Sequence, residues 1–414
     1  MGHGEWVPQL WMVLSFIGLL LSIAVLPLVV PDFWGKVRNQ GIVVAVFSAP
    51  IVFIYLTNSP KALLHSMEEY VSFVILLSSL YIVSGGIWIS GGLKGTPLVN
   101  TAILGIGSVL SNFLGTTGAS MVLIRPFLAA NGHRKHRAHL PIFLIFIVSN
   151  ISGLLTPLGD PPLFLGFLRG VPFFWTLRLF PQWIFAVSIL LAVFYCFDRF
   201  VFKDTAPVAK SDGGDKSPLK LNGKRNLLCL ATIVGSVFLP TPYREIVMVA
   251  AILVTLKITP EQYHKGNNFE YHAIKEVATL FLGIFITMIP ALEILQLKGA
   301  SLGVTAPWQF FWASGAFSSF LDNAPTYLTF IALGQGLKLG GPFMDVPVNI
   351  LIAVSVGAVF FGANTYIGNA PNFMVRSIAA SSGWKMPSFF GYMLWSGCIL
   401  IPLFVLVTFV FFLG

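Results

Sequence analysis

Apolar stretches long enough to cross a bilayer recur along the whole chain, and two of them are interrupted by the same short motif. Residues 156–162 and 365–371 both follow the pattern Thr-x-x-Gly-(Asp/Asn)-x-Pro, at an offset of 209 residues. Glycine and proline interrupt a helix, so each motif leaves unpaired backbone groups at membrane depth. Such backbone is tolerated only where it is buried in protein or lines a water-filled cavity. Two such breaks in matching halves indicate the binding site of a membrane transporter.

The composition supports this class of protein. Of the 414 residues 56% are hydrophobic and 10% are charged, whereas soluble domains have about 25% charged residues. The net charge of +9 comes from Lys and Arg residues between the apolar stretches, which is typical of the cytoplasmic side of a membrane protein rather than of nucleic-acid binding. Cys196, Cys229 and Cys398 are isolated within apolar runs, so we expect them to pack rather than to form disulfides or a metal site.

Ten spanning segments and two shorter paired elements are predicted. The stretches lie at residues 9–30, 41–57, 70–90, 98–130 (broken at 115–118), 140–172 (broken at 156–162), 181–202, 226–241, 243–257, 276–297, 307–333 (broken at 322–325), 347–380 (broken at 364–371) and 387–413. The stretch 98–130 is too long for one span and has a turn signal at its centre, which favours a re-entrant helical hairpin. Residues 203–225 form a polar linker that is rich in turn-forming residues.

A second motif pair indicates that the two halves are copies of one unit. Residues 111–118 align with residues 318–325 at an offset of 207. Residues 1–202 and 226–414 are therefore predicted to be two repeats of five spans and a hairpin. If the basic loop 131–139 is cytoplasmic, most of the 25 Lys and Arg residues fall in cytoplasmic loops, and the two halves have opposite orientations. The predicted fold class is an all-α polytopic membrane protein built from two inverted repeats.

Two acidic residues stand beside the predicted breaks. Asp160 belongs to the broken segment of the first half, and Asp322 stands at the start of the hairpin break of the second. An ionisable side chain at membrane depth is costly and indicates a functional site. Hydroxyl and amide side chains accompany both: Thr116, Thr117, Asn150, Thr156, Asn323, Thr326, Asn364, Thr365, Asn369 and Asn372. Oxygen ligands suit hard cations, so Asp160 and Asp322 are the candidate Na⁺ ligands, and either carboxylate can instead take a proton.

Purely structural interpretations stay open beside this one. An Asp at a break can cap the next helix by accepting backbone N–H bonds, and Gly and Pro can form simple kinks. The three histidines of residues 131–139 are interpreted as part of a solvated basic loop in preference to a pH sensor. His65 with Glu68 and Glu69 is interpreted as a polar loop, and Glu293 as either a proton-relay group or an interfacial residue.

These motifs resemble the ion transporter superfamily. The likeness is carried by Ser-Asn at 149–150, Thr-Pro-Leu-Gly-Asp at 156–160, Phe-Leu-Asp-Asn-Ala-Pro-Thr at 320–326 and Asn-Thr-Tyr-Ile-Gly-Asn-Ala-Pro-Asn at 364–372. Within the superfamily the chain is most similar to sodium/proton antiporters of the NhaD type, and the relatives include arsenite efflux pumps and citrate and dicarboxylate carriers. NhaD-type proteins tend to have an Asp-Asn pair in the first hairpin, where this chain has Gly115-Thr116.

The resemblance implies a midplane site between inverted repeats, and a homodimer whose transport domain slides against a scaffold, as in elevator carriers. It also implies that Asp160 and the Asp322-Asn323 pair belong to the site.

The leading hypothesis is a multi-pass inner-membrane transporter that exchanges sodium or lithium for protons, with lipid and a second copy as its partners, and with no nucleic acid and no cofactor beyond the transported ions. The alternative is a carrier of citrate, dicarboxylate or arsenite, because helix N-termini bind anions. A scaffold or sensor without flux is a third possibility, and an enzyme is a remote one because the motifs of soluble enzymes are absent from the sequence.

Overall fold

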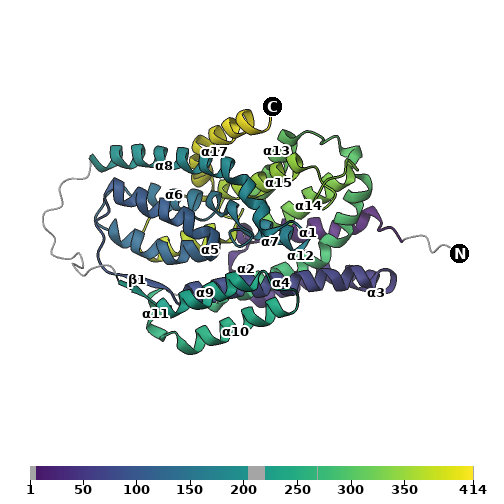
Figure 1. Cartoon of the computed structure of the whole chain (residues 1–414), viewed down its shortest axis with the longest axis horizontal. Coiled ribbons are helices and arrows are strands. Elements are labelled where there is room, and N and C mark those ends of the chain that lie inside the picture. Colours follow the sequence, from purple (N-terminus) through teal and green to yellow (C-terminus); the bar gives the residue numbers. More distant parts are fainter. Residues whose placement is uncertain (1–5, 204–219, 268, 414) are drawn as a thin grey trace.

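The computed structural model describes residues 6–203, 220–267 and 269–413. This part of the chain forms an all-α polytopic membrane protein (Figure 1). Within it, seven helices are long and apolar enough to span a membrane: Leu10–Val29, Val37–Asn58, Pro60–Gly85, Pro97–Ala130, Phe173–Phe202, Tyr271–Leu302 and Phe389–Phe411. Most of the predicted linker 203–225 lies outside the described residues.

The helices follow the order that the sequence predicts. The first half contains η1 (Leu10–Met12), α1 (Val13–Val29), α2 (Pro31–Trp34), α3 (Val37–Asn58), α4 (Pro60–Gly85), α5 (Pro97–Ala130), α6 (His139–Ile147), η2 (Ile151–Leu155), α7 (Pro161–Leu168), η3 (Phe173–Leu179) and α8 (Phe180–Lys203). The second half contains α9 (Lys224–Ser236), α10 (Tyr243–Ile258), α11 (Glu261–Gly266), α12 (Tyr271–Lys298), η4 (Gly299–Leu302), α13 (Pro307–Phe320), α14 (Asn323–Gly336), α15 (Val348–Phe361), η5 (Gly362–Asn364), α16 (Ala370–Ser381) and α17 (Phe389–Phe411).

Two details differ from the prediction. Helix α9 ends at Ser236, before the end of the predicted stretch 226–241, because Pro240 and Pro242 occupy the turn that leads to α10. A short antiparallel pair of strands, β1 (Trp88–Ser90) and β2 (Lys220–Asn222), also joins the end of the predicted linker to the segment after α4.

In both predicted hairpins the chain reverses its direction. Within α5, which we call the first hairpin, Gly115 has φ 72° and ψ 157° and interrupts the helix. Asn100 Nδ2 donates to Asn131 Oδ1 over 3.0 Å, so the two ends of α5 lie side by side. Helices α13 and α14 form the second hairpin, in which the rings of Phe317 and Phe330 pack with centroids 5.6 Å apart.

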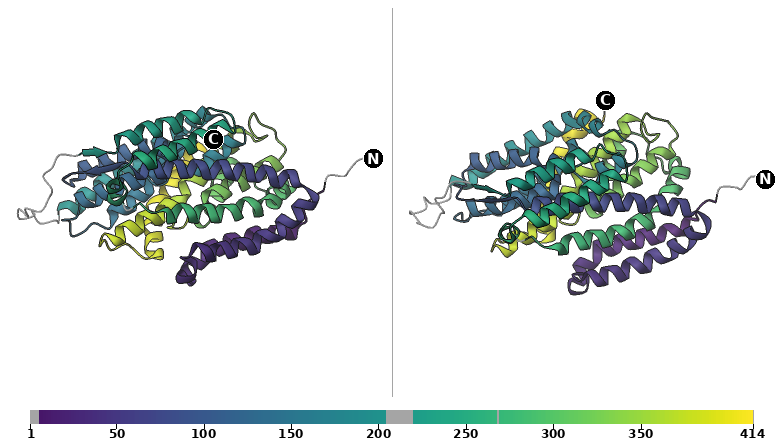
Figure 2. Two further views of the ribbon diagram at one scale, coloured as in Figure 1. Left: turned by 90° about the horizontal axis from the view of Figure 1, so that it is seen from below. Right: turned by 60° about the horizontal axis from the view of Figure 1, so that its bottom comes forward.

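The helices fall into two groups. In the first, α1 and α3 pack against α12, while α9 and α10 pack against α4. Each outer pair therefore contacts the long helix of the other half, and Figure 2 shows the purple N-terminal helices beside α12 at one edge. The second group contains α5–α8 and α13–α17. At its centre α6 is buried along its whole length and α15 is buried along most of it, which explains why both are apolar on every side.

Candidate functional site

The helix breaks of both halves meet around the carboxylate of Asp160, which is 1% exposed. Thr116, directly after the break in the first hairpin, donates its hydroxyl to Asp160 Oδ1 over 2.9 Å. Asn369, directly before α16, donates its amide to the same oxygen over 3.1 Å. Asn323, at the start of α14, donates its amide to Asp160 Oδ2. A buried carboxylate is thus satisfied by three donors from three other elements, as a charge in a low-dielectric interior requires.

Glycines allow the first hairpin to reach Asp160. Gly115 has a positive φ, which residues with a Cβ rarely adopt, and a Cβ there would also lie 3.3 Å from Leu158 O. A Cβ on Gly159 would lie 2.2 Å from Gly153 O. With these Cβ atoms absent, Thr116 N donates to Gly159 O over 2.9 Å and joins the hairpin tip to the break before α7.

The doubled Thr-x-x-Gly sequence has a direct structural explanation. Thr156 Oγ1 donates to Asn112 O of the first hairpin over 2.5 Å and accepts a hydrogen bond from Gly159 N over 3.1 Å. The threonine therefore anchors its loop to the hairpin and also closes the turn that follows.

The second copy repeats both bonds. Thr365 Oγ1 donates to Ser319 O of the second hairpin over 2.5 Å and accepts from Gly368 N over 3.1 Å. The two motifs thus make the same contacts with corresponding positions of their own hairpins.

Asparagines connect the two broken helices to each other. Asn150 Nδ2 donates to Asn372 Oδ1 over 2.7 Å, and Asn369 Nδ2 donates to Asn150 Oδ1 over 3.1 Å. Asn372 Nδ2 in turn donates to the carbonyls of Gly362 and Thr365, at 2.7 and 2.9 Å. The break in each half is therefore held by an amide from the other half or from its own following helix.

Asp322 differs from Asp160 in its bonding. Its carboxylate accepts a hydrogen bond from Ala324 N over 3.0 Å and caps α14, so the capping interpretation is confirmed for this residue. Asp160 occupies the same position before α7, but its side chain makes no capping bond and instead contacts the other breaks. The two acids that the sequence singles out thus have different immediate partners.

A pocket of about 90 Å³ lies beside Asp160, between the two helix groups. One wall carries Gly115, Thr116, Thr117, Asp322 and Asn369, and the other carries apolar residues of α4 and α12. Its volume exceeds the about 10–15 Å³ that one water needs, so it has room for an ion with several ligands or waters.

Other predicted site residues lie behind this wall. Thr156, Asn150 and Thr365 do not line the pocket and hold the loops in place through the bonds described above. Asn364 Nδ2 donates to Ser319 Oγ over 2.9 Å. The carbonyl oxygens Asn323 Oδ1 and Asn364 Oδ1 are buried without a hydrogen-bond partner in the described part of the chain, so both are available as ligands of a cation.

Four helix N-termini surround the site. The helical segments that begin after Gly115, Asp160, Asp322 and Asn369 all start beside it. A helix N-terminus carries about half a positive elementary charge, and its free N–H groups favour anions. The site therefore combines two carboxylates with four positive dipole ends, an arrangement that suits a bound anion and a bound cation together.

Residues 5–412 match the model of a family whose description reads "Putative citrate transport". The chain belongs to this family. No curated protein matches the chain. A family of citrate transport fits the ion transporter superfamily that the motifs resemble, but it does not single out the NhaD type. Together with the spanning helices it identifies a multi-pass membrane transporter.

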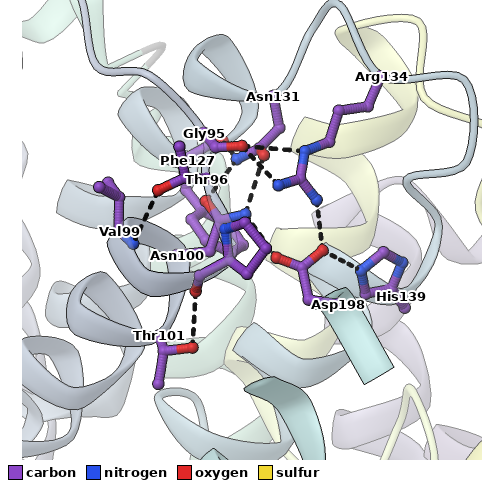
Figure 3. A network of polar contacts seen from close by, with 11 residues as sticks. Gly95, Thr96, Val99, Asn100, Thr101, Phe127, Asn131, Arg134, His139 and Asp198 are labelled. Atoms are coloured by element: carbon purple, nitrogen blue, oxygen red, sulfur yellow. Dashed lines mark hydrogen bonds and ion pairs between the residues drawn. The ribbon is translucent and has the colours of Figure 1, made fainter. Parts of the chain in front are cut away.

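The structure contains a buried ionic cluster that the local sequence patterns do not predict (Figure 3). Asp198 of α8 accepts hydrogen bonds from Arg134, from His139 Nε2 over 2.9 Å and from Asn100 Nδ2 over 3.0 Å. Arg134, His139 and Asp198 are all at most 3% exposed. The interpretation of residues 131–139 as a solvated loop is therefore wrong for Arg134 and His139, because a carboxylate and the Gly95 carbonyl draw Arg134 inward.

Two further acids are also bonded. Glu69 is 5% exposed and binds Arg169 through both carboxylate oxygens at 2.8 Å, so its assignment to a polar loop is wrong. Glu293 accepts a hydrogen bond from the Tyr55 hydroxyl over 2.7 Å within the first helix group. The sequence feature that could have predicted that Glu69 is buried and Glu293 half-buried is their position in or beside an apolar helix.

Proposed function

We propose that this chain is a secondary transporter of the inner membrane that carries a citrate-like di- or tricarboxylate together with a cation. The observation that carries the proposal is the meeting of four helix N-termini around two acids, in a pocket whose described lining contains no Lys or Arg. An anionic substrate needs positive charge, and the dipole ends provide part of it. A cation held between Asp322 and the substrate provides the rest.

Each group has a proposed role. The Asp322 carboxylate and the Asn323 Oδ1 carbonyl are the ligands that we propose for the cation, which oxygen chemistry makes Na⁺ or H⁺ rather than a soft metal. Thr116 and Thr117 have hydroxyls in the pocket wall that can donate to a substrate carboxylate. Asp160 is a positioning residue in this scheme, because its carboxylate orients the amides of Asn323 and Asn369.

We further propose that residues 1–202 and 226–414 are inverted repeats and that the second helix group moves against the first in a homodimer. The equal hydrogen bonds of Thr156 and Thr365 support the repeats. The position of the pocket between the helix groups supports the movement, since sliding one group along the other would carry a bound substrate across the membrane.

A second candidate is exchange of sodium or lithium for protons. The observation that favours it is the pair of membrane acids, since Asp322 lines the pocket and Asp160 lies directly behind it. In this scheme a cation and protons compete for the carboxylates, and no organic anion binds.

Flux in liposomes separates the two candidates. Purified protein is reconstituted and challenged with labelled citrate, succinate and arsenite under imposed Na⁺, Li⁺, K⁺ and pH gradients. We expect uptake of a polycarboxylate, and we expect this uptake to require an inward Na⁺ or proton gradient. The Asp322→Asn variant should lose the uptake. The control variant Asp345→Asn, which changes an exposed acid, should retain it. Sodium-dependent proton flux without uptake of any carboxylate would establish the antiporter instead, and the absence of all flux would contradict both.

A further inference from the structure

A second and larger groove lies between the second hairpin and helices α1 and α12. Its volume is about 500 Å³, within the range of about 300–1,000 Å³ that is typical of ligand sites. It lies apart from the candidate site, since the described residues that line the two cavities do not overlap. Neither the family nor the proposed transport reaction assigns an occupant to this groove.

The groove follows the helix axes. Its wall on η1 and α1 runs from Leu10 to Leu21, which corresponds to about 17 Å at about 1.5 Å per residue. Its wall on α12 and η4 runs from Ala291 to Leu302 and has the same length. This is close to half of the about 30 Å hydrocarbon thickness of a bilayer, which is the depth of one lipid leaflet. The groove therefore has the length and direction of one acyl chain.

The walls are chemically suited to a hydrocarbon. The hydroxyls of Thr326 and Thr329, which line the groove, donate to the carbonyls of Asp322 and Pro325 of their own segment at 2.9 and 2.8 Å. Their hydrogen-bonding capacity is thus used within α14 and leaves an apolar surface. Most other lining residues are Leu, Ile, Val and Phe.

One end of the groove carries a positive charge. Among the described lining residues only Lys298 is charged, and it is exposed at the C-terminal end of α12. Ser301, whose hydroxyl donates to Lys298 O over 2.7 Å, lies beside it. A lysine at the mouth of a chain-length apolar groove complements an amphiphile with an anionic head and a hydrocarbon tail.

We propose that the groove binds one acyl chain of an anionic glycerophospholipid from the bilayer, with the phosphate at Lys298. The inner end of the groove reaches Leu321, which is adjacent in the chain to Asp322 of the candidate site. The bound chain therefore packs against the tip of the second hairpin.

Photo-crosslinking tests the occupant directly. The full chain is placed in nanodiscs that contain a phosphatidylglycerol with a photoactivatable group in one acyl chain, and the labelled peptides are mapped by mass spectrometry. We expect labels to concentrate on the groove faces of α1, α12 and α14. Phosphatidylcholine with the same photoactivatable chain should label these faces several-fold less.

Two variants complete the test. Lys298→Glu should lower the labelling by phosphatidylglycerol several-fold without changing that by phosphatidylcholine, and Ile17→Trp should lower both by filling the groove. Lys61→Glu, at an exposed lysine of α4, is the matched control and should change neither. Labels spread evenly over lipid-facing helices, equal labelling by both lipids, or crosslinks between two copies at this face would overturn the proposal. Elution of each variant on size exclusion verifies its folding, and Lys298→Gln replaces Lys298→Glu if the latter does not fold.

Discussion

The side-chain amide of Asn369 donates to the carboxylate of Asp160 over 3.1 Å, so the two residues that occupy the same place in the doubled motif touch each other. One copy supplies the acceptor and the other the donor. A pair of aspartates here would place two like charges in contact, and a pair of asparagines would leave Thr116 and Asn323 without a charged acceptor. The difference between the motifs is therefore what allows the two halves to meet.

Replacing Asp160 by Asn should lower both stability and transport. Asn has one acceptor oxygen and one NH₂ group, so it would oppose at least one of the donors Thr116, Asn323 and Asn369. Leaving a buried polar group without a partner costs about 1–3 kcal/mol. We expect a lower melting temperature in detergent and reduced transport, because Thr116 and Asn369, two of the three donors, line the pocket. An unchanged melting temperature would show that the three donors find other acceptors.

Replacing Asp322 by Asn should separate function from stability. Asn caps a helix about as well as Asp, so the bond from Ala324 N can be kept and the melting temperature should change little. The charge that we propose for cation binding is lost, however, and cation-dependent transport should disappear. Normal transport by this variant would exclude the carboxylate as a cation ligand.

The sequence predicts the breaks well because they depend on local chemistry. Residues 115–118, 156–162 and 364–371 concentrate glycine, proline and polar residues within a few positions, and the structure has its breaks there. The hydrogen-bond partners of Asp160 cannot be predicted in this way. The sequence singles out Asp160 and Asp322, but Asn323 and Asn369, which donate to Asp160, come from segments far along the chain, and only tertiary packing brings them together.

The buried ion pairs likewise cannot be predicted from local sequence. Arg134 lies in a short basic segment that local patterns assign to solvent, and its partner Asp198 follows 64 residues later on α8. Glu69 is likewise separated by 100 residues from Arg169. A charge pattern within a loop contains no information about a carboxylate on another helix, so burial of such residues can be predicted only with the fold in hand.

Replacing Gly115 by Ala should impair transport in addition to lowering the stability of the protein. The φ of 72° and ψ of 157° of Gly115 lie in a region that is essentially restricted to glycine and costs other residues about 1–3 kcal/mol, and the added Cβ would press on Leu158 O at 3.3 Å. Gly340→Ala is the matched control, because its φ of 70° is similar and a Cβ there meets nothing within 4 Å. We expect both variants to lose some thermal stability and only Gly115→Ala to lose transport. Equal transport by the two variants would contradict a special role of this break.

The pair of Glu69 and Arg169 should couple the two helix groups, because Glu69 is on α4 and Arg169 follows α7. Glu69→Gln and Arg169→Gln should each lower the melting temperature, and the double variant should lower it by less than the sum. Contacting residues show coupling energies of about 0.5–3 kcal/mol, which a double-mutant cycle from thermal or denaturant unfolding can resolve. Strict additivity would mean that the two side chains do not interact in the membrane.

Replacing Asp198 should be the most destabilising of these changes. Its carboxylate is fully buried and is shared by Arg134, His139 and Asn100, so Asp198→Asn would leave the guanidinium of Arg134 in the interior without its counter-ion. Breaking a buried pair in this way costs about 3–5 kcal/mol. We expect poor expression or a strongly lowered melting temperature, measured by fluorescence-detected size exclusion after heating. Arg134→Gln in the same background should restore part of the loss, because it removes the unpaired charge while keeping a donor for Gly95 O. If the double variant is no more stable than Asp198→Asn, the cost arises from packing around α8 rather than from charge.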